Sequence, residues 1–425
     1  MKRSLLCLLF VFTYTVLLSQ KDCRQDDYQQ QLLKLHPLLH VQYDKVEAFG
    51  LNHHFPFIKT GNADTVSASP VFVVPERIII PVVVHVLWNS SAQNISDAQI
   101  LSQIDVLNKD YSGLNTDRNK IPSYFSALAA NCGISFVLAK TDPQGHATTG
   151  IVRKQTSTAV FGFDDKAKSN ATNGDDAWNS DNYLNIWVCT LVSGISGYSS
   201  VPGGPKEVDG VVINTGVFGT ININGPFNKG RTATHEIGHW LNLRHIWGDA
   251  YCGDDKVDDT PTQQAANRGC ITGEKFTCGS TEHGDMYMNY MDFSDDACMY
   301  MFTKGQRDRM RVLFETGGIR NSLLFSNALN GNEIPLQDTI AQSSMDIELQ
   351  LYPNPATNTI TIQLKGNMNV SGNKIYICNY LGQIVKTVRC ASKVQQADIS
   401  ALAPGLYFIR IDGLQKNAMK KFVKE

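Results

Sequence analysis

The chain has 425 residues, of which 42% are hydrophobic and 18% are charged. This length predicts two or three folded domains, and this composition excludes a wholly disordered chain. The formal net charge of −2 gives no reason to expect a nucleic acid or an anionic membrane as a partner.

The N-terminus predicts export from the cell. Lys2 and Arg3 are positively charged, and residues 5–18 form an almost wholly apolar run that is too short to span a bilayer comfortably. We therefore expect residues 1–20 to be a secretory signal peptide, and no later segment predicts a membrane span. Ten cysteines fit an oxidising compartment. Removal of Cys7 with the signal peptide leaves an odd number of cysteines.

Residues 21–75 are polar and contain one modest helical stretch around residues 28–39, so we expect a pro-segment or linker without a core of its own. The main domain is expected at residues 76–325. Residues 77–88 are typical of a buried strand, and Ser96 is a candidate N-cap for a helix with apolar residues at helical spacing. Further strands are predicted at residues 134–139, 184–189 and 210–214. These elements predict a mixed sheet with one long helix behind it.

Two regions follow that differ in composition from the predicted sheet. Residues 252–298 are rich in loops and acidic residues and contain four cysteines, and residues 326–345 predict a polar linker. Residues 346–425 consist of short runs of alternating hydrophobic and polar residues. That pattern is typical of a small all-β sandwich.

His235, Glu236 and His239 form the pattern His-Glu-x-x-His in a predicted helix. One helical turn separates the two histidines, so both imidazoles can reach one ion. Zinc with three protein ligands keeps an open position, where it lowers the pKa of a bound water towards neutrality. Glu236 is placed to take the proton of that water. We therefore predict a catalytic zinc site with Glu236 as its general base.

His245 is the predicted third ligand. The helix must end after about Leu241 for the chain to bring His245 under the metal, and this turn needs a residue with positive φ. Asn242 occupies that position, and asparagine tolerates positive φ best after glycine. The alternative is a chance match on an ordinary helix, and the third histidine argues against it.

Residues 235–245 resemble the metzincin pattern His-Glu-x-x-His-x-x-Gly-x-x-His, with Asn242 in place of the glycine. Metzincins also have a turn with a methionine below the zinc, and residues 289–293 are similar to that turn, with Met291 as its methionine. Taken alone, Met291 would more often be a core residue. Phe293 stands where many relatives have a tyrosine that assists at the zinc.

Residues 76 to about 320 resemble the pappalysin family of metzincins, in particular its bacterial ulilysin-like members. The resemblance rests on His-Glu-Ile-Gly-His-Trp-Leu from His235, Asp-Thr-Pro from Asp259, Asn-Tyr-Met-Asp from Asn289 and Asp-Asp-Ala-Cys from Asp295. It implies an α+β metzincin fold with a twisted mixed sheet, a backing helix and a zinc helix. An irregular, disulfide-bonded lower subdomain follows.

The four cysteines of residues 252–298 allow three pairings, and the resemblance implies Cys252–Cys278 and Cys270–Cys298. Two further candidate pairs are Cys132 with Cys189 and Cys378 with Cys390. Cys23 then remains. Several metallopeptidase zymogens block the open zinc position with a pro-segment thiolate, and Cys23 is a candidate for such a latency switch. A spare thiol or an intermolecular disulfide is the alternative.

The acidic loop of residues 253–260 is similar to the calcium-binding loop of the family. Calcium binds carboxylate, carbonyl and hydroxyl oxygens, and the best matches are Asp255, the carbonyl of Asp258, and Thr260. The alternative is a solvated acidic loop. Relatives that cleave before Arg or Lys have an acidic residue near the methionine turn. Asp295 and Asp296 are close to that turn, so a preference for basic residues at the cleavage site is a further expectation.

The C-terminal region resembles the C-terminal sorting domain of the type IX secretion system. The residues that carry this resemblance are Leu-Tyr-Pro-Asn-Pro from Leu351 and Leu-Ala-Pro-Gly-Leu-Tyr from Leu402. The resemblance implies that secretion machinery is a partner and that the chain is released or kept at the outer-membrane surface. The alternative is a carbohydrate-binding or adhesive β-sandwich.

Together these features predict a secreted zinc endopeptidase that acts on proteins or peptides, with calcium as a second metal. Two other functions are compatible with the sequence, namely another zinc amidohydrolase and a non-catalytic surface adhesin that holds zinc. Glu236 argues against the adhesin because a structural zinc site needs no base and usually has four protein ligands.

Overall fold

The computed structural model describes residues 23–52, 74–279, 283–329, 348–365, 374–379, 384–411 and 419–425. The expected signal peptide (residues 1–20) and most of the expected linker (residues 326–345) lie outside these ranges. The helices are α1 (Gln25–Leu35), α2 (Leu39–Asn52), α3 (Asp97–Ser112), α4 (Ser123–Ser126), α5 (Arg231–Trp240) and α6 (Lys304–Arg311). No helix in the described ranges is both long and apolar enough to cross a bilayer.

Six strands form the central sheet, in the order β2-β1-β4-β6-β5, with β3 also paired to β1. All pairs are parallel except that of β5 with β6. The strands are β1 (Ile78–Trp88), β2 (Ile134–Leu138), β3 (Ile151–Gln155), β4 (Leu184–Cys189), β5 (Gly197–Ser199) and β6 (Val211–Asn214). The sheet is mixed, as predicted, and the antiparallel strand β5 lies at its edge. The sequence did not predict β3 and β5, because both are short and lack a long apolar run.

The backing helix α3 begins and ends where its sequence predicts. Ser96 Oγ accepts a hydrogen bond from the backbone N of Gln99 at 3.2 Å, and Gly113 ends the helix with φ of 65°. Its apolar side packs against β2 and α5, and Ile100, Leu107 and Tyr111 are fully buried. The helix therefore joins the sheet to α5, the helix that contains the predicted zinc motif.

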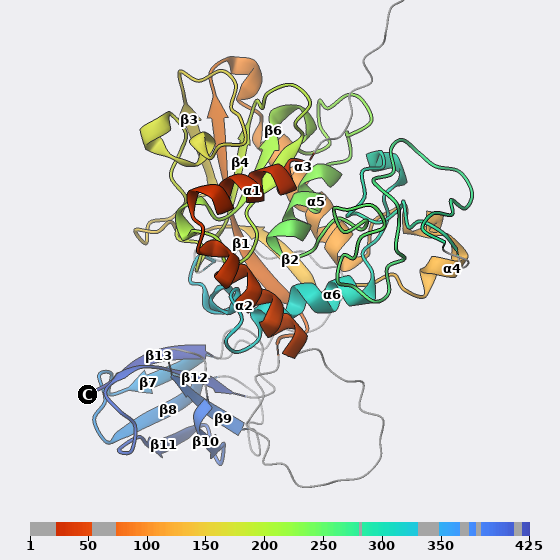
Figure 1. The fold of residues 1–425 in the computed structure, drawn as a ribbon. Coiled ribbons are helices and arrows are strands. Elements are labelled where there is room, and N and C mark those ends of the chain that lie inside the picture. The colour runs from red at the N-terminus through yellow and green to blue at the C-terminus, as the bar shows by residue number, and fades with distance from the viewer. Residues whose placement is uncertain are drawn as a thin grey trace, which may run out of the picture.

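The N-terminal segment is more structured than the sequence predicts. It forms two helices rather than one, and Figure 1 shows them in red on the front of the main domain, with α1 near α5 and α2 near α6. Tyr28 and Leu32 are buried in a hydrophobic cluster with residues of the sheet, including Trp187 and Tyr198. The segment thus adds side chains to a core of the main domain, which the sequence did not predict. The segment has too few apolar side chains to form a core alone, so its packing against the sheet could not be predicted from its own residues.

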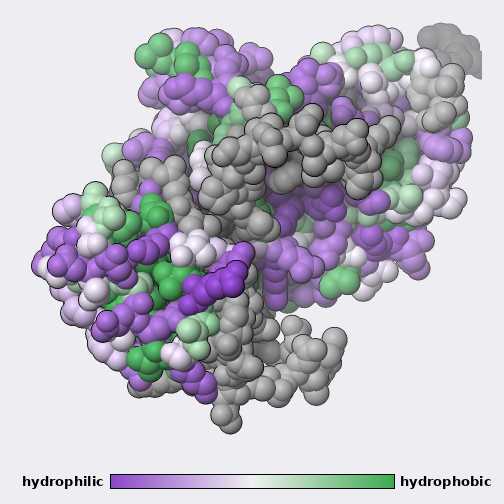
Figure 2. All heavy atoms as spheres, turned by 90° about the horizontal axis from the view of Figure 1, so that it is seen from below, coloured by the Kyte–Doolittle hydropathy of each residue, from purple (hydrophilic) through white to green (hydrophobic). Residues whose placement is uncertain are grey.

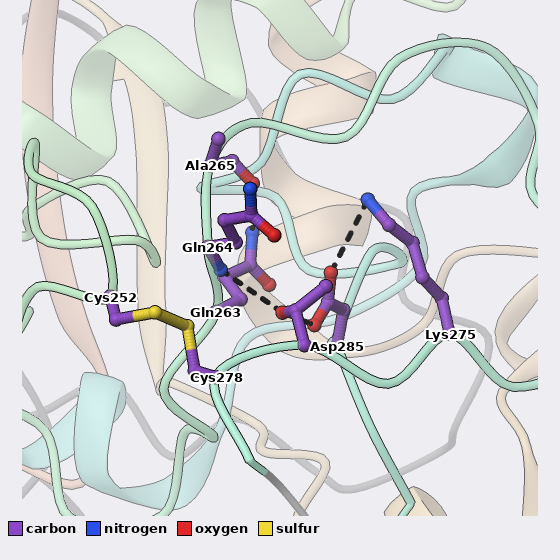
Figure 3. The surroundings of a disulfide bond; sticks show 8 residues. Cys252, Gln263, Gln264, Ala265, Lys275, Cys278 and Asp285 are labelled. Atoms are coloured by element: carbon purple, nitrogen blue, oxygen red, sulfur yellow. Dashed lines mark hydrogen bonds and ion pairs between the residues drawn. A yellow bond between two sulfur atoms is a disulfide. The ribbon is translucent and has the colours of Figure 1, made fainter.

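Disulfides Cys252–Cys278 and Cys270–Cys298 hold the irregular region after α5, which confirms both expected pairings. Figure 3 shows the first disulfide near the ion pair of Lys275 Nζ and Asp285 Oδ2, which lie 3.4 Å apart. With so little regular structure in this region, cross-links and side-chain bonds of this kind fix its loops.

The other two candidate disulfides were wrong. Cys132 and Cys189 are separate thiols in the sheet domain, where burial raises the pKa of Cys132 to about 12 and the pKa of Cys189 further. Cys390 Sγ donates to the carbonyl of Ser392 at 3.5 Å, so it is a thiol and forms no disulfide with Cys378. A sequence count of cysteines cannot distinguish such buried thiols from cross-links.

The C-terminal region is all-β, as predicted. One antiparallel sheet has the order β10-β9-β12-β13 and the other has the order β11-β8-β7, with a shared buried cluster that includes Ile360, Ile377 and Ile409. Figure 2 shows hydrophilic and hydrophobic side chains together on the visible face of this region. The strands are β7 (Glu348–Tyr352), β8 (Thr359–Lys365), β9 (Lys374–Asn379), β10 (Ile384–Arg389), β11 (Val394–Asp398), β12 (Gly405–Ile411) and β13 (Met419–Lys424).

Candidate active site

Helix α5 is held firmly at both ends. At its start, Asp296 Oδ2 accepts hydrogen bonds from the backbone N of Lys229 at 2.8 Å and of Arg231 at 3.2 Å, which places a carboxylate at the positive end of the helix. At its end, Asn242 has φ of 70°, the left-handed conformation that the sequence predicts there. The backbone N of Leu243 then bonds the carbonyl of Gly238 at 2.9 Å, so the chain turns back under the helix.

This turn brings His235, His239 and His245 together. The Nε2 atom of His239 lies 3.1 Å from Nε2 of His235 and 3.1 Å from Nε2 of His245. Nδ1 of His235 lies 2.7 Å from the carbonyl of Tyr290, and Nδ1 of His239 lies 2.9 Å from the carbonyl of Leu243. A carbonyl only accepts, so these Nδ1 atoms carry the ring protons. With the proton on Nδ1, Nε2 is the ring atom that can bind a metal in the shared space.

His245 is oriented in the same way, because its Nδ1 is hydrogen-bonded to the carboxylate of Asp249. Three lone pairs directed at one point repel each other unless a cation lies between them. Nitrogens bound to one tetrahedral zinc at about 2.0–2.1 Å lie roughly 3.3 Å apart, close to the separations of the three Nε2 atoms. The residues of this site therefore fit a zinc ion, with carbonyl and carboxylate partners that orient each ring.

Glu236 lies next to this centre and is fully buried. It faces the edge strand β5, because a Cβ atom added to Gly197 would lie 3.0 Å from its Cγ and 3.1 Å from its Oε1. The absence of a side chain at residue 197 is what allows the carboxylate and the strand to come this close. An extended peptide that pairs with β5 would pass beside Glu236.

Met291 and Phe293 form the apolar base of the site. A Cβ atom added to Gly238 would lie 2.5 Å from Met291 Sδ, so the methionine is packed directly against α5. The Phe293 ring centroid lies 5.0 Å from that of His245 and 5.6 Å from that of His235. Phe293 therefore supports the histidine rings but offers no hydroxyl to a reacting carbonyl.

A buried polar network behind α5 was not predicted from the sequence. Asp110 of α3 accepts hydrogen bonds from Thr234 Oγ1 at 2.8 Å and from Tyr290 Oη at 2.9 Å. Tyr290 is also the residue whose carbonyl orients His235. Asp110 thus joins the backing helix, the zinc helix and the methionine turn. Burial raises the pKa of Asp110 to about 6, although Arg231 and both hydroxyls oppose the shift.

The first residue of α5 is anchored to the same network by charge. Arg231 Nη1 and Nη2 donate to the two carboxylate oxygens of Asp117 at 2.8 and 2.7 Å. Burial raises the pKa of Asp117, but the hydrogen bonds and charge of Arg231 outweigh it, and the pKa falls to about 2. No short motif marks these partners, which are separated by more than one hundred residues.

Cys23 of the N-terminal segment also lies in the site. Its Sγ is 3.4 Å from Oε2 of Glu236 and 3.5 Å from Nε2 of His239. The ligand atoms of Cys23 and the three histidines all lie within 4.8 Å of one another. A parallel bridge pairs Cys23 with Gly197, so the segment lies along the outer edge of β5.

The acidic loop brings together some of the expected calcium ligands. Asp255 is buried, and both of its carboxylate oxygens accept from Thr260 Oγ1, at 2.9 and 3.0 Å. The Thr260 hydroxyl lies 2.7 Å from the carbonyl of Val257, whereas the side chain of Asp258 is exposed. Burial raises the pKa of Asp255 to about 7. A buried carboxylate beside a hydroxyl and a carbonyl suits a hard cation.

Comparison with known proteins agrees with this geometry. Residues 167–315 match the M43 peptidase family, described as pregnancy-associated plasma protein-A. An extracellular metalloprotease of Pyricularia oryzae is 35% identical over 240 residues, which are 54% of this chain and 73% of that protein. The chain belongs to the M43 family of metallopeptidases. An extracellular metalloprotease of Verticillium alfalfae is 43% identical to this M43 chain over 135 residues, which are 30% of this chain and 48% of that protein.

Two solved structures resemble the M43 chain over most of their length. Mature mirolysin of Tannerella forsythia, in complex with a cleaved peptide, is 50% identical with a TM-score of 0.58, over 58% of this chain and 96% of that chain. A promirolysin mutant from the same organism is 44% identical with a TM-score of 0.64, over 72% of this chain and 97% of that chain.

Residues 350–425 match a secretion system C-terminal sorting domain. The M43 chain is therefore a secreted zinc metalloendopeptidase.

Proposed function

We propose that His235, His239 and His245 hold the zinc of this endopeptidase and that Glu236 is its general base. The convergence of three Nε2 lone pairs, each from a ring whose Nδ1 has an acceptor, carries this proposal. Zinc at this centre supplies a Lewis acid that makes water acidic near neutral pH.

Glu236 accepts the proton of the water that attacks the scissile carbonyl and donates it to the leaving amine. The substrate backbone reaches this carboxylate by pairing with β5, whose Gly197 faces Glu236. Phe293 contributes packing against the rings of His235 and His245 but no proton.

Cleavage of casein and gelatin by the processed enzyme tests this proposal, with calcium present and zinc content matched. Glu236→Ala is expected to retain zinc and to lose about 10²- to 10⁴-fold in activity, the usual contribution of a general base. Glu207→Ala, at an exposed position, is the matched control and is expected to cut normally. If the parent holds zinc and cuts neither protein, an adhesin or an amidohydrolase with other substrates explains the site better.

The N-terminal segment is proposed to keep the enzyme latent through Cys23. As a thiolate, Cys23 would hold the open position of a bound zinc. It would also block the approach of a substrate to Glu236, because its Sγ lies 3.4 Å from Oε2 of that residue. A polar cavity of about 370 Å³ lies between α1, α2 and the loop after α5. This incomplete contact favours release of the segment once it is cut.

Substitution of Cys23 separates latency from the two alternatives for this thiol. Cys23→Ala is expected to give an unprocessed chain that cleaves peptides at once, whereas the parent shows a lag until the segment is removed. A spare thiol predicts equal lags in the two chains. An intermolecular disulfide predicts a covalent dimer of the parent that reducing agent dissolves.

A preference for Arg or Lys directly after the scissile bond is proposed with Asp295 as the recognising carboxylate. Asp295 is partly exposed, whereas Asp296 is buried and binds the start of α5. Peptides that differ only in Arg or Ala at that position test this assignment. Asp295→Ala is expected to abolish the preference for Arg, and an unchanged preference would remove Asp295 from the proposal.

Calcium is proposed to bind at Asp255, the carbonyl of Asp258 and Thr260. Its role is to hold the loop after the third zinc ligand, where little regular structure is present. Removal of calcium at constant zinc is expected to lower the thermal midpoint of the parent but not that of Asp255→Asn. Equal midpoints of the parent with and without calcium would identify a solvated loop instead.

A further inference from the structure

Tyr28 of helix α1 fills a pocket whose polar and aromatic partners Asp165, Lys168 and Tyr198 belong to the main domain. Its side chain is 1% exposed, and its ring lies 4.9 Å from the ring of Tyr198 on β5. Its hydroxyl donates to Asp165, 2.8 Å from Oδ1 and 3.0 Å from Oδ2, and accepts from Lys168 Nζ at 3.0 Å. The pocket therefore recognises both the ring and the hydroxyl of a tyrosine.

Lys168 makes this pocket unusual. It is 1% exposed, and its three ammonium protons have three acceptors, namely Tyr28 Oη, the Val208 carbonyl at 2.9 Å and Asp165 Oδ1 at 2.9 Å. Removal of the N-terminal segment takes away one acceptor and opens its place to water. A substrate hydroxyl that replaces this water restores the acceptor that Tyr28 supplies in the latent chain.

The route from the zinc centre to this pocket follows β5. The backbone N of Arg24 bonds the carbonyl of Gly197 at 3.3 Å, and Oε1 of Gln25 accepts from the backbone N of Ser199 at 3.2 Å. The Gln25 side chain thus takes the place of a peptide carbonyl at the edge of the strand. Two extended residues and three helical steps place Tyr28 about 11 Å from Cys23.

The direction of the N-terminal segment indicates which side of the scissile bond the pocket serves. The segment runs parallel to β5, away from the zinc centre and towards the pocket. A substrate that adds to β5 in the more favourable antiparallel sense runs the opposite way. It would then pass the pocket before it reaches Glu236. About 11 Å corresponds to three or four extended residues.

We propose that Lys168, Asp165 and Tyr198 form a substrate subsite for a tyrosine side chain, three or four residues before the scissile bond. This inference rests on the proposed endopeptidase activity and on removal of the N-terminal segment. Tyr28 then occupies in the latent chain the position that a substrate tyrosine takes in the processed one. The subsite selects tyrosine over phenylalanine because only tyrosine satisfies both the ammonium and the carboxylate.

Internally quenched peptides test the subsite with the processed enzyme. The peptides carry Tyr, Phe or Ala at one position at a time, from five residues before to four residues after the scissile bond. We expect kcat/KM for Tyr to exceed that for Phe by about tenfold at the third or fourth residue before the bond. Uniform cleavage of all peptides, or a preference confined to the other side of the bond, would overturn the subsite but not the proposed endopeptidase function. If no peptide is cut, the proposed function fails and this inference fails with it.

Two variants assign the preference to residues. Lys168→Met is expected to reduce the Tyr-to-Phe ratio to about one, because it removes the buried donor but keeps the aliphatic chain. Lys166→Met is the matched control, since Lys166 is 61% exposed and bonds Asp164 outside the pocket. A ratio unchanged by Lys168→Met contradicts the assignment.

A competition experiment needs no enzyme variant and so does not depend on the folding of Lys168→Met. A synthetic peptide of residues 23–35 is expected to inhibit the processed enzyme about tenfold more weakly when Tyr28 is replaced by Phe. Equal inhibition by the two peptides would show that the hydroxyl is not recognised and would overturn the subsite.

Discussion

A buried ion pair fixes the C-terminal end of the zinc helix. Arg320 Nη1 and Nη2 donate to Asp209 Oδ2 and Oδ1 at 2.5 and 2.9 Å, and the guanidinium lies 3.8 Å over the ring of Trp240. Trp240 Nε1 donates to the same carboxylate at 3.2 Å. Trp240 directly follows His239, so this ion pair packs against the zinc helix. We predict that loss of Arg320 lowers the free energy of unfolding of this domain.

The loss of stability can be estimated from the contacts of Asp209 that Arg320→Met retains and removes. Methionine retains much of the packing on Trp240 but removes both charged donors, so the Asp209 carboxylate keeps only the neutral donors of Trp240 and Ser200. Loss of one partner of a buried pair costs about 3–5 kcal/mol. With a urea m-value of about 3 kcal/mol/M, the unfolding midpoint falls by about 1.0–1.7 M.

Urea unfolding followed by tryptophan fluorescence measures this change. All five tryptophans precede residue 248, so the signal does not report on the C-terminal β region. Arg307→Met is the matched control, because Arg307 is 34% exposed and bonds its neighbour Asp308, and such a pair contributes about 1 kcal/mol or less. Equal small shifts for Arg320→Met and Arg307→Met would refute the assigned role of the ion pair.

Three further predictions concern the site and its supports. Asp249→Asn is expected to lower zinc affinity about 10- to 100-fold by weakening the orientation of His245, measured by competition with a chromophoric chelator; a change below about twofold would contradict this. Gly197→Ala is expected to displace Glu236 and to reduce kcat while zinc content is unchanged, and full activity would show that the strand yields without moving the carboxylate. The pKa of Asp117, lowered to about 2, contributes about 2 kcal/mol of stability that is present above pH of about 4 and lost as the pH falls to about 2. Urea midpoints at pH 2–6 are expected to show this acid dependence in the parent and not in Asp117→Asn; parallel profiles would disprove it.

Local sequence was sufficient to predict the helix and the turn that bring the three histidines together. The spacing of His235 and His239 on one helix, and the tolerance of Asn242 for positive φ, depend on neighbouring residues only. The strand and helix of residues 77–112 were predicted for the same reason, since their apolar runs and the Ser96 cap are local signals. The pairing of Cys252 with Cys278 required the family resemblance, because four cysteines allow three pairings.

The partners that orient the site were beyond local reasoning. Asp249 and Tyr290 bind the histidines through contacts that depend on the turn after α5 and on the distant methionine turn. Strand β5 has only three residues, so no alternating pattern reveals it. Tyr28 gave no signal, because the pocket of Lys168 and Tyr198 that buries it is assembled from loops and strands far along the chain.

Zinc titration of the metal-free, processed enzyme tests the proposed centre most directly. Peptide hydrolysis is expected to rise in proportion to added zinc and to level off at about one zinc per chain. His239→Ala is expected to lose both tight zinc binding and hydrolysis, whereas Glu236→Ala binds the same single zinc and remains inactive. Hydrolysis by Glu236→Ala at the parent rate, or full activity of His239→Ala at one zinc per chain, would contradict the account.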